Sequence, residues 1–248
     1  MKTFHNFATA SLSELYTNTT IGKSEKFEAN TLSTGIFINS SENDNLKLDF
    51  KPLPSMAQLS PAFGIALADI NTDGNMDIFL AQNFYSPQIE TRPMDNALSL
   101  VLISDGNGDF TALTAEESGI VLPGDSKAVS WGDLDGDGYL ELLVTTNDGP
   151  VHSFSVNPKI EDSSKIKIDL IGSKKNPNAI GAKVSIETND NKRISRIIKS
   201  GSGYLSQSSN QIIVSRELVG GKITIDWPDS KKSTSYIPDK TKSLTISY

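Results

Sequence analysis

Two short segments of the chain place oxygen-bearing side chains at alternating positions. The first reads DINTDGNMD and the second DLDGDGYLE. When such a segment curls, the alternate side chains converge on one centre, the glycine permits a tight turn, and the last carboxylate closes the shell. Hard cations that bind oxygen, Ca²⁺ above all, take about six to eight such ligands. The sequence therefore predicts two calcium sites, with the ligands Asp69, Asn71, Asp73, the Asn75 carbonyl and Asp77 in the first loop, and Asp133, Asp135, Asp137, the Tyr139 carbonyl and Glu141 in the second.

Other interpretations of these loops are weaker. An EF-hand needs a glutamate at the twelfth loop position and flanking helices, but that position holds Leu80 in one loop and Val144 in the other. Magnesium is the lesser candidate, because it prefers a rigid octahedron that retains several waters. Asp-Gly pairs also form ordinary hairpin turns, as we expect for Ser104 to Phe110, SDGNGDF, which lacks the alternating carboxylates. An ordinary turn needs no third or fourth carboxylate, so two loops of equal spacing favour a metal.

Charge supports a structural role for the cation. The two loops hold seven acidic residues, whose mutual repulsion would oppose folding. Two Ca²⁺ ions, each adding two positive charges, would move the formal net charge from −7 to −3. We therefore expect the ions to stabilise the fold rather than to take part in a reaction.

The elements that carry the loops form an internal repeat. The stretch FGIALADINTDGNMDIFLAQN from Phe63 superposes on AVSWGDLDGDGYLELLVTTN from Ala128, which aligns the first acids of the two loops about 64 residues apart. A strand, turn, strand hairpin repeats as well, ending once at Phe50 and once at Phe110. Short runs rich in Ile, Val, Leu and Phe, bounded by Gly, Asn, Asp and Pro, predict strands. A unit of this size is close to that of a propeller blade.

Charge and composition divide the chain further. Residues 1–158 hold 7 Lys and Arg against 21 Asp and Glu, whereas residues 159–248 hold 16 against 9, and residues 157–164 have the composition of a linker. The sequence thus predicts a segment 1–33 with a short helix around Phe7 to Tyr16, a repeat region 34–157 and a C-terminal β domain 165–248. The fold class is all-β, with partial β-propeller-type repeats followed by a small β-sandwich or barrel-like domain. The strands expected in the tail are Lys165 to Ile171, Ala182 to Thr188, Ile194 to Lys199, Gln211 to Ser215, Lys222 to Trp227 and Ser243 to Tyr248.

The repeats resemble those of FG-GAP or VCBS proteins, whose blades form the integrin α-subunit propeller and carry DxDxDG calcium loops. Further on, NPNAIGAKV, SGSGYLSQSS and ITIDWPDS resemble the ASPIC/UnbV domain, in the order found in cartilage acidic protein-like and bacterial UnbV-type proteins. Together the similarities cover roughly residues 35–248. The chain departs from the family where IIVSREL replaces an FGLG-like stretch and WPDS replaces WPSG or WPDG. Two aspartate loops and one preceding hairpin are too few to close a propeller, so we expect either the C-terminal part of a longer protein or a truncated, open repeat region.

The residues offer little to an enzyme. The chain has two histidines, His5 and His152, and it has no nucleophile elbow, HExxH motif or phosphate loop. The acidic loops could supply a general acid and base for polysaccharide hydrolysis, and a hydrolase or its accessory carbohydrate-binding module is the alternative function. We expect instead a non-enzymatic scaffold that binds a protein or carbohydrate. Tyr85, Trp131 and Trp227 are possible contacts for such a ligand, although burial in the core is the more ordinary role of these side chains.

Partners and compartment follow from the same observations. The lysines of the tail are scattered and lack interleaved aromatic residues, which argues against nucleic acid. No apolar run approaches a membrane span, and the first twenty residues lack the apolar stretch of a signal peptide. The chain has no cysteine and so no disulfide framework. The family resemblance implies an extracellular, cell-surface or periplasmic setting, where millimolar calcium would fill even weak sites.

Overall fold

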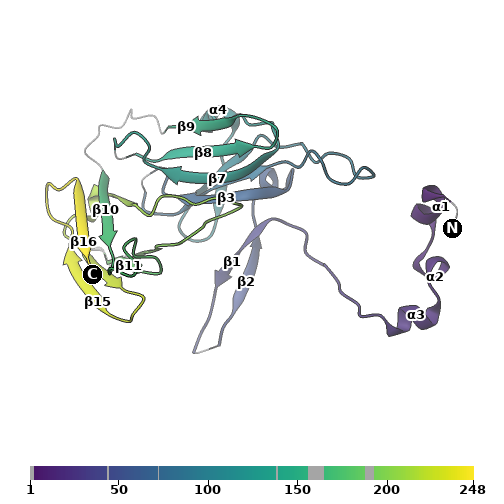
Figure 1. Cartoon of the computed structure of the whole chain (residues 1–248), viewed down its shortest axis with the longest axis horizontal. Helices are drawn as coiled ribbons and strands as arrows, with labels where there is room; N and C mark the ends of the chain where they lie inside the picture. Colours follow the sequence, from purple (N-terminus) through teal and green to yellow (C-terminus); the bar gives the residue numbers. More distant parts are fainter. Residues whose placement is uncertain (1–2, 44, 72, 138, 156–164, 188–192) are drawn as a thin grey trace. The chain divides into compact units, whose positions relative to one another are not determined.

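The structure is a computed structural model that describes residues 3–43, 45–71, 73–137, 139–155, 165–187 and 193–248. It divides into two compact units, Met1–Ser33 and Thr34–Tyr248. Strands dominate the larger unit and form several antiparallel sheets, which confirms the predicted all-β class (Figure 1). The linker predicted at 157–164 lies outside the described residues.

The described residues of the first unit, 3–33, contain three short helices rather than the single helix predicted around Phe7 to Tyr16. The prediction fails because Ser11 starts a new helix, its backbone N–H donating to the Glu14 carboxylate at 2.7 Å. None of the three helices has a buried residue. No helix in the described part of the chain is long and apolar enough to cross a membrane. The helices are α1 Phe4–Thr9, α2 Leu12–Leu15 and α3 Asn18–Lys23.

The described residues of the repeat region form three antiparallel sheets, in the strand orders β1-β2, β3-β4-β5-β6 and β7-β8-β9. The apolar runs of the sequence become strands, and the two predicted hairpins are β1-β2 and β5-β6. The strands are β1 Gly35–Asn39, β2 Leu48–Pro52, β3 Ala62–Ala68, β4 Asp77–Gln82, β5 Leu100–Ser104, β6 Phe110–Ala112, β7 Ser126–Gly132, β8 Glu141–Thr146 and β9 Val151–Phe154, with a 3-10 helix η1 at Ser55–Gln58 and helix α4 at Ala115–Ser118.

Strand β4 is buried along its whole length because it faces two cores. Ile78 and Leu80 pack with β5 and with the β1-β2 hairpin, whereas Phe79 and Ala81 pack against β7 and β8 of the next sheet. Since successive side chains of a strand point to opposite faces, an unbroken apolar run suits a strand with sheets on both sides. Sheets that stack face to face in this way are consistent with propeller-type blades.

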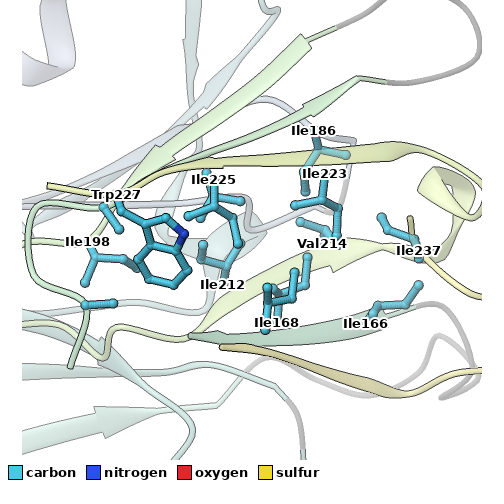
Figure 2. Packing of buried hydrophobic residues seen from close by; sticks show 14 residues of the cluster. Ile166, Ile168, Ile186, Ile198, Ile212, Val214, Ile223, Ile225, Trp227 and Ile237 are labelled. Carbon is cyan, nitrogen blue, oxygen red and sulfur yellow. The ribbon is translucent and has the colours of Figure 1, made fainter. Parts of the chain in front are cut away.

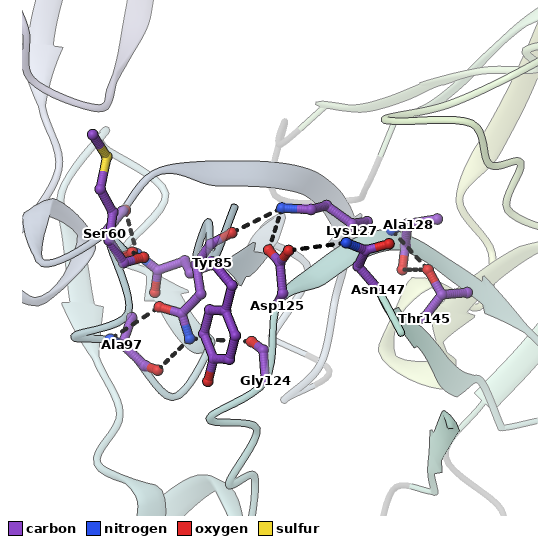
Figure 3. A network of polar contacts seen from close by, with 12 residues as sticks. Ser60, Tyr85, Ala97, Gly124, Asp125, Lys127, Ala128, Thr145 and Asn147 are labelled. Carbon is purple, nitrogen blue, oxygen red and sulfur yellow. Dashed lines mark hydrogen bonds and ion pairs between the residues drawn. The ribbon is translucent and has the colours of Figure 1, made fainter. Parts of the chain in front are cut away.

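A partly buried lysine joins the sheet β7-β8-β9 to the sheet β3-β4-β5-β6. Lys127 of β7 donates from Nζ to the Asn83 carbonyl at 3.0 Å and forms an ion pair with Asp125. Its ammonium also lies 3.5 Å from the centre of the Phe63 ring. Figure 3 shows Asp125 between Lys127 and the amide of Asn147. These contacts join the two sheets at their junction.

The C-terminal strands form a sandwich of two sheets, in the orders β13-β10-β16 and β12-β11-β14-β15. Ile168 and Val214 of one sheet share a core with Ile223 and Ile225 of the other (Figure 2). The predicted sandwich or barrel-like domain is thus a sandwich, with no closed barrel among the described strands. The strands are β10 Lys165–Ile171, β11 Lys183–Glu187, β12 Arg193–Ile197, β13 Ile212–Ser215, β14 Lys222–Asp226, β15 Lys232–Tyr236 and β16 Ser243–Ser247, with a 3-10 helix η2 at Arg216–Leu218.

The predicted tail strands are all present, with ends displaced by no more than two residues. The predicted end of the second, at Thr188, lies outside the described residues. Strand β15 is one that the apolar runs do not predict. Its sequence KSTSY has no aliphatic residue, because β15 is an edge strand with exposed residues alternating along it.

Candidate metal centre

The two aspartate loops occupy equivalent places in the fold. The first joins β3 to β4 and the second joins β7 to β8, so each connects the first two strands of a sheet. Both loops end on the acid that begins the second of these strands, Asp77 in β4 and Glu141 in β8. Thr72 of the first loop and Gly138 of the second, which aligns with Gly74, lie outside the described residues.

The same hydrogen bonds shape the middle of each loop. In the first, the Asp73 N–H donates to Asn71 Oδ1 at 3.1 Å and the Asn75 N–H donates to Asp73 Oδ1 at 2.8 Å. In the second, the Asp137 N–H donates to Asp135 Oδ1 at 3.1 Å and the Tyr139 N–H donates to Asp137 Oδ1 at 2.8 Å. Short acidic and amide side chains commonly turn their own backbone in this way. The equal pattern shows that the repeat read from the sequence extends to the local geometry of the loops.

The last acid of each loop holds the loop to its own first turn. Glu141 accepts the Leu134 N–H at 2.7 Å, and Asp77 accepts the equivalent Ile70 N–H at 2.8 Å. Asp77 also accepts the Ser104 N–H at 2.9 Å, so its two oxygens join the loop to β5. Burial raises the pKa of Asp77, and these backbone donors oppose the rise.

The first acid of the first loop is only partly satisfied. Asp69 accepts the Gly74 N–H at 3.0 Å through Oδ2, while its Oδ1 is buried and has no hydrogen-bond partner. Burial raises the pKa of Asp69, and the nearby charges of Asp73 and Asp77 raise it further. A buried carboxylate oxygen without a donor is costly, and a bound cation would remove that cost. The donor set of this loop therefore fits a metal ion.

The second loop brings three carboxylates together. Asp133, Asp135 and Glu141 each offer an oxygen, and the three oxygens lie within 4.8 Å of one another. Ligands on opposite sides of one Ca²⁺ ion are about 4.6 to 5.2 Å apart, so a single ion can reach all three. Within the described residues, the acids of the first loop do not gather this closely. Of the two loops, the second therefore has its carboxylate oxygens closer to the arrangement that a bound Ca²⁺ ion needs.

Two of the predicted ligands serve other contacts. The side chain of Asn75 lies against Gly106, where a Cβ would be 2.5 Å from its Oδ1. The Tyr139 ring is buried beneath the ammonium of Lys165, which lies 4.0 Å from the ring centre. Neither contact involves the backbone carbonyl, the group through which these two residues are predicted to bind the ion.

Two basic residues of the C-terminal sandwich reach the loops, and the motif analysis does not predict them. Lys167 of β10 places Nζ 3.8 Å from Asp133 Oδ2. The charge of Arg196 in β12 opposes the rise in the pKa of Asp69. The one signal in the sequence is the opposite charge of the two halves, which permits such docking without naming the residues.

The aromatic residues considered as ligand contacts differ in exposure. Trp131 and Trp227 are core residues, exposed by 6% and 4%. Tyr85 is partly exposed, but its hydroxyl donates to the Pro123 carbonyl. Tyr85 is therefore the one of the three whose ring a ligand could reach.

Comparison with known families agrees with the motifs. Residues 172–248 match the ASPIC and UnbV family, and residues 92–144 match the FG-GAP-like repeat, a range that includes the whole second aspartate loop. No curated protein matches the chain. The resemblance inferred from the sequence is confirmed: the chain carries an FG-GAP-like repeat followed by an ASPIC/UnbV domain.

Proposed function

We propose that this chain, with its FG-GAP-like repeat and ASPIC/UnbV domain, is a non-enzymatic interaction protein whose repeat sheets are stabilised by two Ca²⁺ ions, one in each aspartate loop. The observation that carries the proposal is the cluster of three carboxylate oxygens within 4.8 Å in the second loop. The matching hydrogen bonds of the first loop extend the proposal to a second ion.

Different oxygens would bind the ion in the two loops. In the second, Asp133, Asp135 and Glu141 supply carboxylate oxygens at the mouth of the turn. In the first, Asp69 Oδ1 is the buried oxygen that still lacks a partner. Calcium suits these loops better than magnesium, because it accepts irregular shells that mix carboxylates with backbone carbonyls.

Bound calcium would act on stability through the strands that the loops join. Each loop ties β3 to β4 or β7 to β8, and each carries several like charges in a small volume. An ion that binds only the folded chain stabilises it by about 2.7 kcal/mol when its free concentration is a hundred times the dissociation constant. Calcium would therefore hold the stacked sheets together and keep their outer surfaces in shape for a partner.

The proposed partner is a protein or a carbohydrate met outside the cell or at its surface. FG-GAP repeats often mediate protein interaction and are typically surface-associated or extracellular. Millimolar calcium in that setting would keep even a weak site filled.

A polysaccharide hydrolase is less well supported. Asp77 is fully buried and both of its oxygens accept backbone N–H groups, so it is poorly placed to exchange a proton with a substrate. His152 stacks on the Phe154 ring, with the ring centres 6.4 Å apart, and His5 lies in the exposed helix α1. Among the residues that the structure describes, neither histidine lies in a group of three or more His, Asp or Glu side chains that could bind one ion.

A thermal melt of the purified chain tests the calcium proposal. In CaCl₂ at millimolar concentration the midpoint should lie several degrees above that in EDTA, because about 2.7 kcal/mol per site corresponds to such a shift in a domain of this size. The double variant Asp73→Ala, Asp137→Ala should lose the shift. The matched control is Asp105→Ala, in the Ser104 to Phe110 turn, which should keep it. No shift in the wild-type protein would rule out structural calcium at these loops.

A further inference from the structure

The C-terminal sandwich docks on the first strands of the repeat sheets. Residues 200–209, called the docking loop here, lie along the free edge of β7. The Ser209 N–H donates to the Trp131 carbonyl at 2.7 Å, and the Trp131 N–H donates to Ser208 Oγ at 3.1 Å. At β3, Gly203 passes so close that a Cβ would lie 3.1 Å from the Ile65 carbonyl oxygen. The docking loop therefore completes backbone hydrogen bonds that an edge strand would otherwise leave open.

This docking brings a lysine to the second aspartate loop. Lys167 Nζ lies 3.8 Å from Asp133 Oδ2, and the Asp133 side chain is only 2% exposed. Lys165, two residues earlier on β10, covers the Tyr139 ring of the same loop. A charge pair with a nearly buried member is weakly screened by salt. Lys167 thus acts as a counter-charge to the first acid of this loop.

A similar contact occurs at the first aspartate loop. Ile194 of β12 packs on the turn, its Cδ1 being 3.6 Å from where a Cβ on Gly74 would lie. Arg196, on the same face of β12, is partly buried, and its charge and that of Asp69 stabilise each other. The first acid of each loop is therefore stabilised by the charge of a basic residue of the C-terminal sandwich.

We propose that Lys167 and Arg196 compete electrostatically with calcium, so that Ca²⁺ binding to the loops and docking of the C-terminal sandwich on the repeat sheets weaken each other. This inference rests on the proposed calcium binding. A divalent ion held by Asp133 would lie within about 6 Å of the Lys167 ammonium, and an ion held by Asp69 would be repelled by the charge of Arg196, because like charges repel. Coupling of two binding events is reciprocal, so what lowers calcium affinity must also loosen the docked domain when calcium arrives. The attraction between the acidic repeat sheets and the basic C-terminal sandwich would then determine the stability of docking at a given calcium concentration.

Calcium titration of the full chain by calorimetry tests the first half of the proposal. Lys167→Gln should bind calcium more tightly at one site, by about three- to tenfold, as Coulomb's law gives for a unit charge some 6 Å from a divalent ion in an aqueous setting. Arg196→Gln should also bind calcium more tightly, at the other site. Lys167→Arg retains the charge and should keep the wild-type affinity. The matched control is Lys183→Gln, which removes one positive charge from the exposed face of β11.

The outcomes separate this inference from the function it rests on. If calcium binds the wild-type chain and all variants equally, the competition is wrong while the calcium sites stand. If calcium binds none of them, both proposals fail. If Lys183→Gln tightens binding as much as the loop variants, the effect is one of net charge and the specific placement of Lys167 and Arg196 is refuted.

Hydrogen exchange tests the reciprocal half. The Ser209 N–H reports docking, because its acceptor is the Trp131 carbonyl in the other domain. The Gly181 N–H, which donates to the Ile198 carbonyl within the sandwich, is the internal control. Relative to Gly181, Ser209 should exchange faster in calcium than in EDTA, by the same factor that Lys167 and Arg196 together impose on affinity. Equal or slower exchange of Ser209 in calcium would overturn the proposal.

Discussion

Replacement of Asp69 by asparagine should change protein stability in opposite directions with and without calcium. The substitution keeps the shape of the side chain and leaves an oxygen to accept the Gly74 N–H, while it removes a buried negative charge whose Oδ1 has no hydrogen-bond partner. In EDTA at pH 7 we expect Asp69→Asn to be more stable than the wild type by about 1 kcal/mol, a moderate part of the cost of a buried unsatisfied polar group. In calcium the variant loses a ligand, and we expect it to be less stable by up to about 2.7 kcal/mol.

The pH dependence of stability independently tests the sign of the effect expected for Asp69→Asn in EDTA. Burial raises the pKa of Asp69 above the ordinary value of 3.8, so the folded chain favours the protonated carboxyl. The stability that this protonation contributes is complete below pH 3.8 and is lost as the pH rises through the folded-state pKa. The advantage of Asp69→Asn in EDTA should therefore be present at pH 7 and vanish below pH 3.8.

Urea denaturation measures both effects, with EDTA or CaCl₂ at pH 7 and with EDTA in acid. Asp105→Asn is the matched control: this exposed aspartate accepts the N–H groups of Asn107 and Asp109, which lower its pKa. It should lose stability at pH 7 whether or not calcium is present. If Asp69→Asn behaves like this control, the argument that the Asp69 carboxylate is held ready for a cation is wrong.

Two further predictions concern the junction between the repeat sheets. Lys127→Met leaves the buried Asp125 carboxylate without its positively charged partner and should destabilise the chain by about 3 kcal/mol. Adding Asp125→Asn should restore part of that loss, as measured by urea denaturation. Gly64→Ala places a Cβ 2.4 Å from the Lys127 carbonyl oxygen. We therefore expect the free energy of unfolding to fall by about 1 to 3 kcal/mol and the melting temperature to fall with it. A neutral Gly64→Ala variant would contradict the close approach of β3 to β7.

The apolar runs predicted most strands because burial, rather than local preference, shapes these segments. Ile78 to Leu80 read as a strand since both faces of β4 must be apolar. Strand β15 could not be predicted from apolar runs for the opposite reason. Its outer face is exposed to solvent, where Ser and Thr are as acceptable as aliphatic residues. Helix α2 begins at Leu12 because Ser11 caps it through a contact with Glu14, which a search for one apolar helical face overlooks.

The aspartate loops could be predicted residue by residue because their spacing is local. The role of their neighbours could not. Lys167 and Arg196 are distant in sequence from the acids they face, and a count of charges says only that the halves attract. The gathering of Asp133, Asp135 and Glu141, in contrast with the looser first loop, also depends on how the backbone curls rather than on which residues are present.

The double-faced strand β4 has a consequence for how the repeat region comes apart. Since Ile78 and Leu80 belong to one core and Phe79 and Ala81 to the other, removal of β4 would strip both cores of side chains at once. Among the described residues, the hairpin β1-β2 and the sheet β7-β8-β9 share no core cluster, yet each packs in a core that contains residues of β4. The stacked sheets should therefore open in a single cooperative event, and a mutation on one side of β4 should be felt as faster opening on the other.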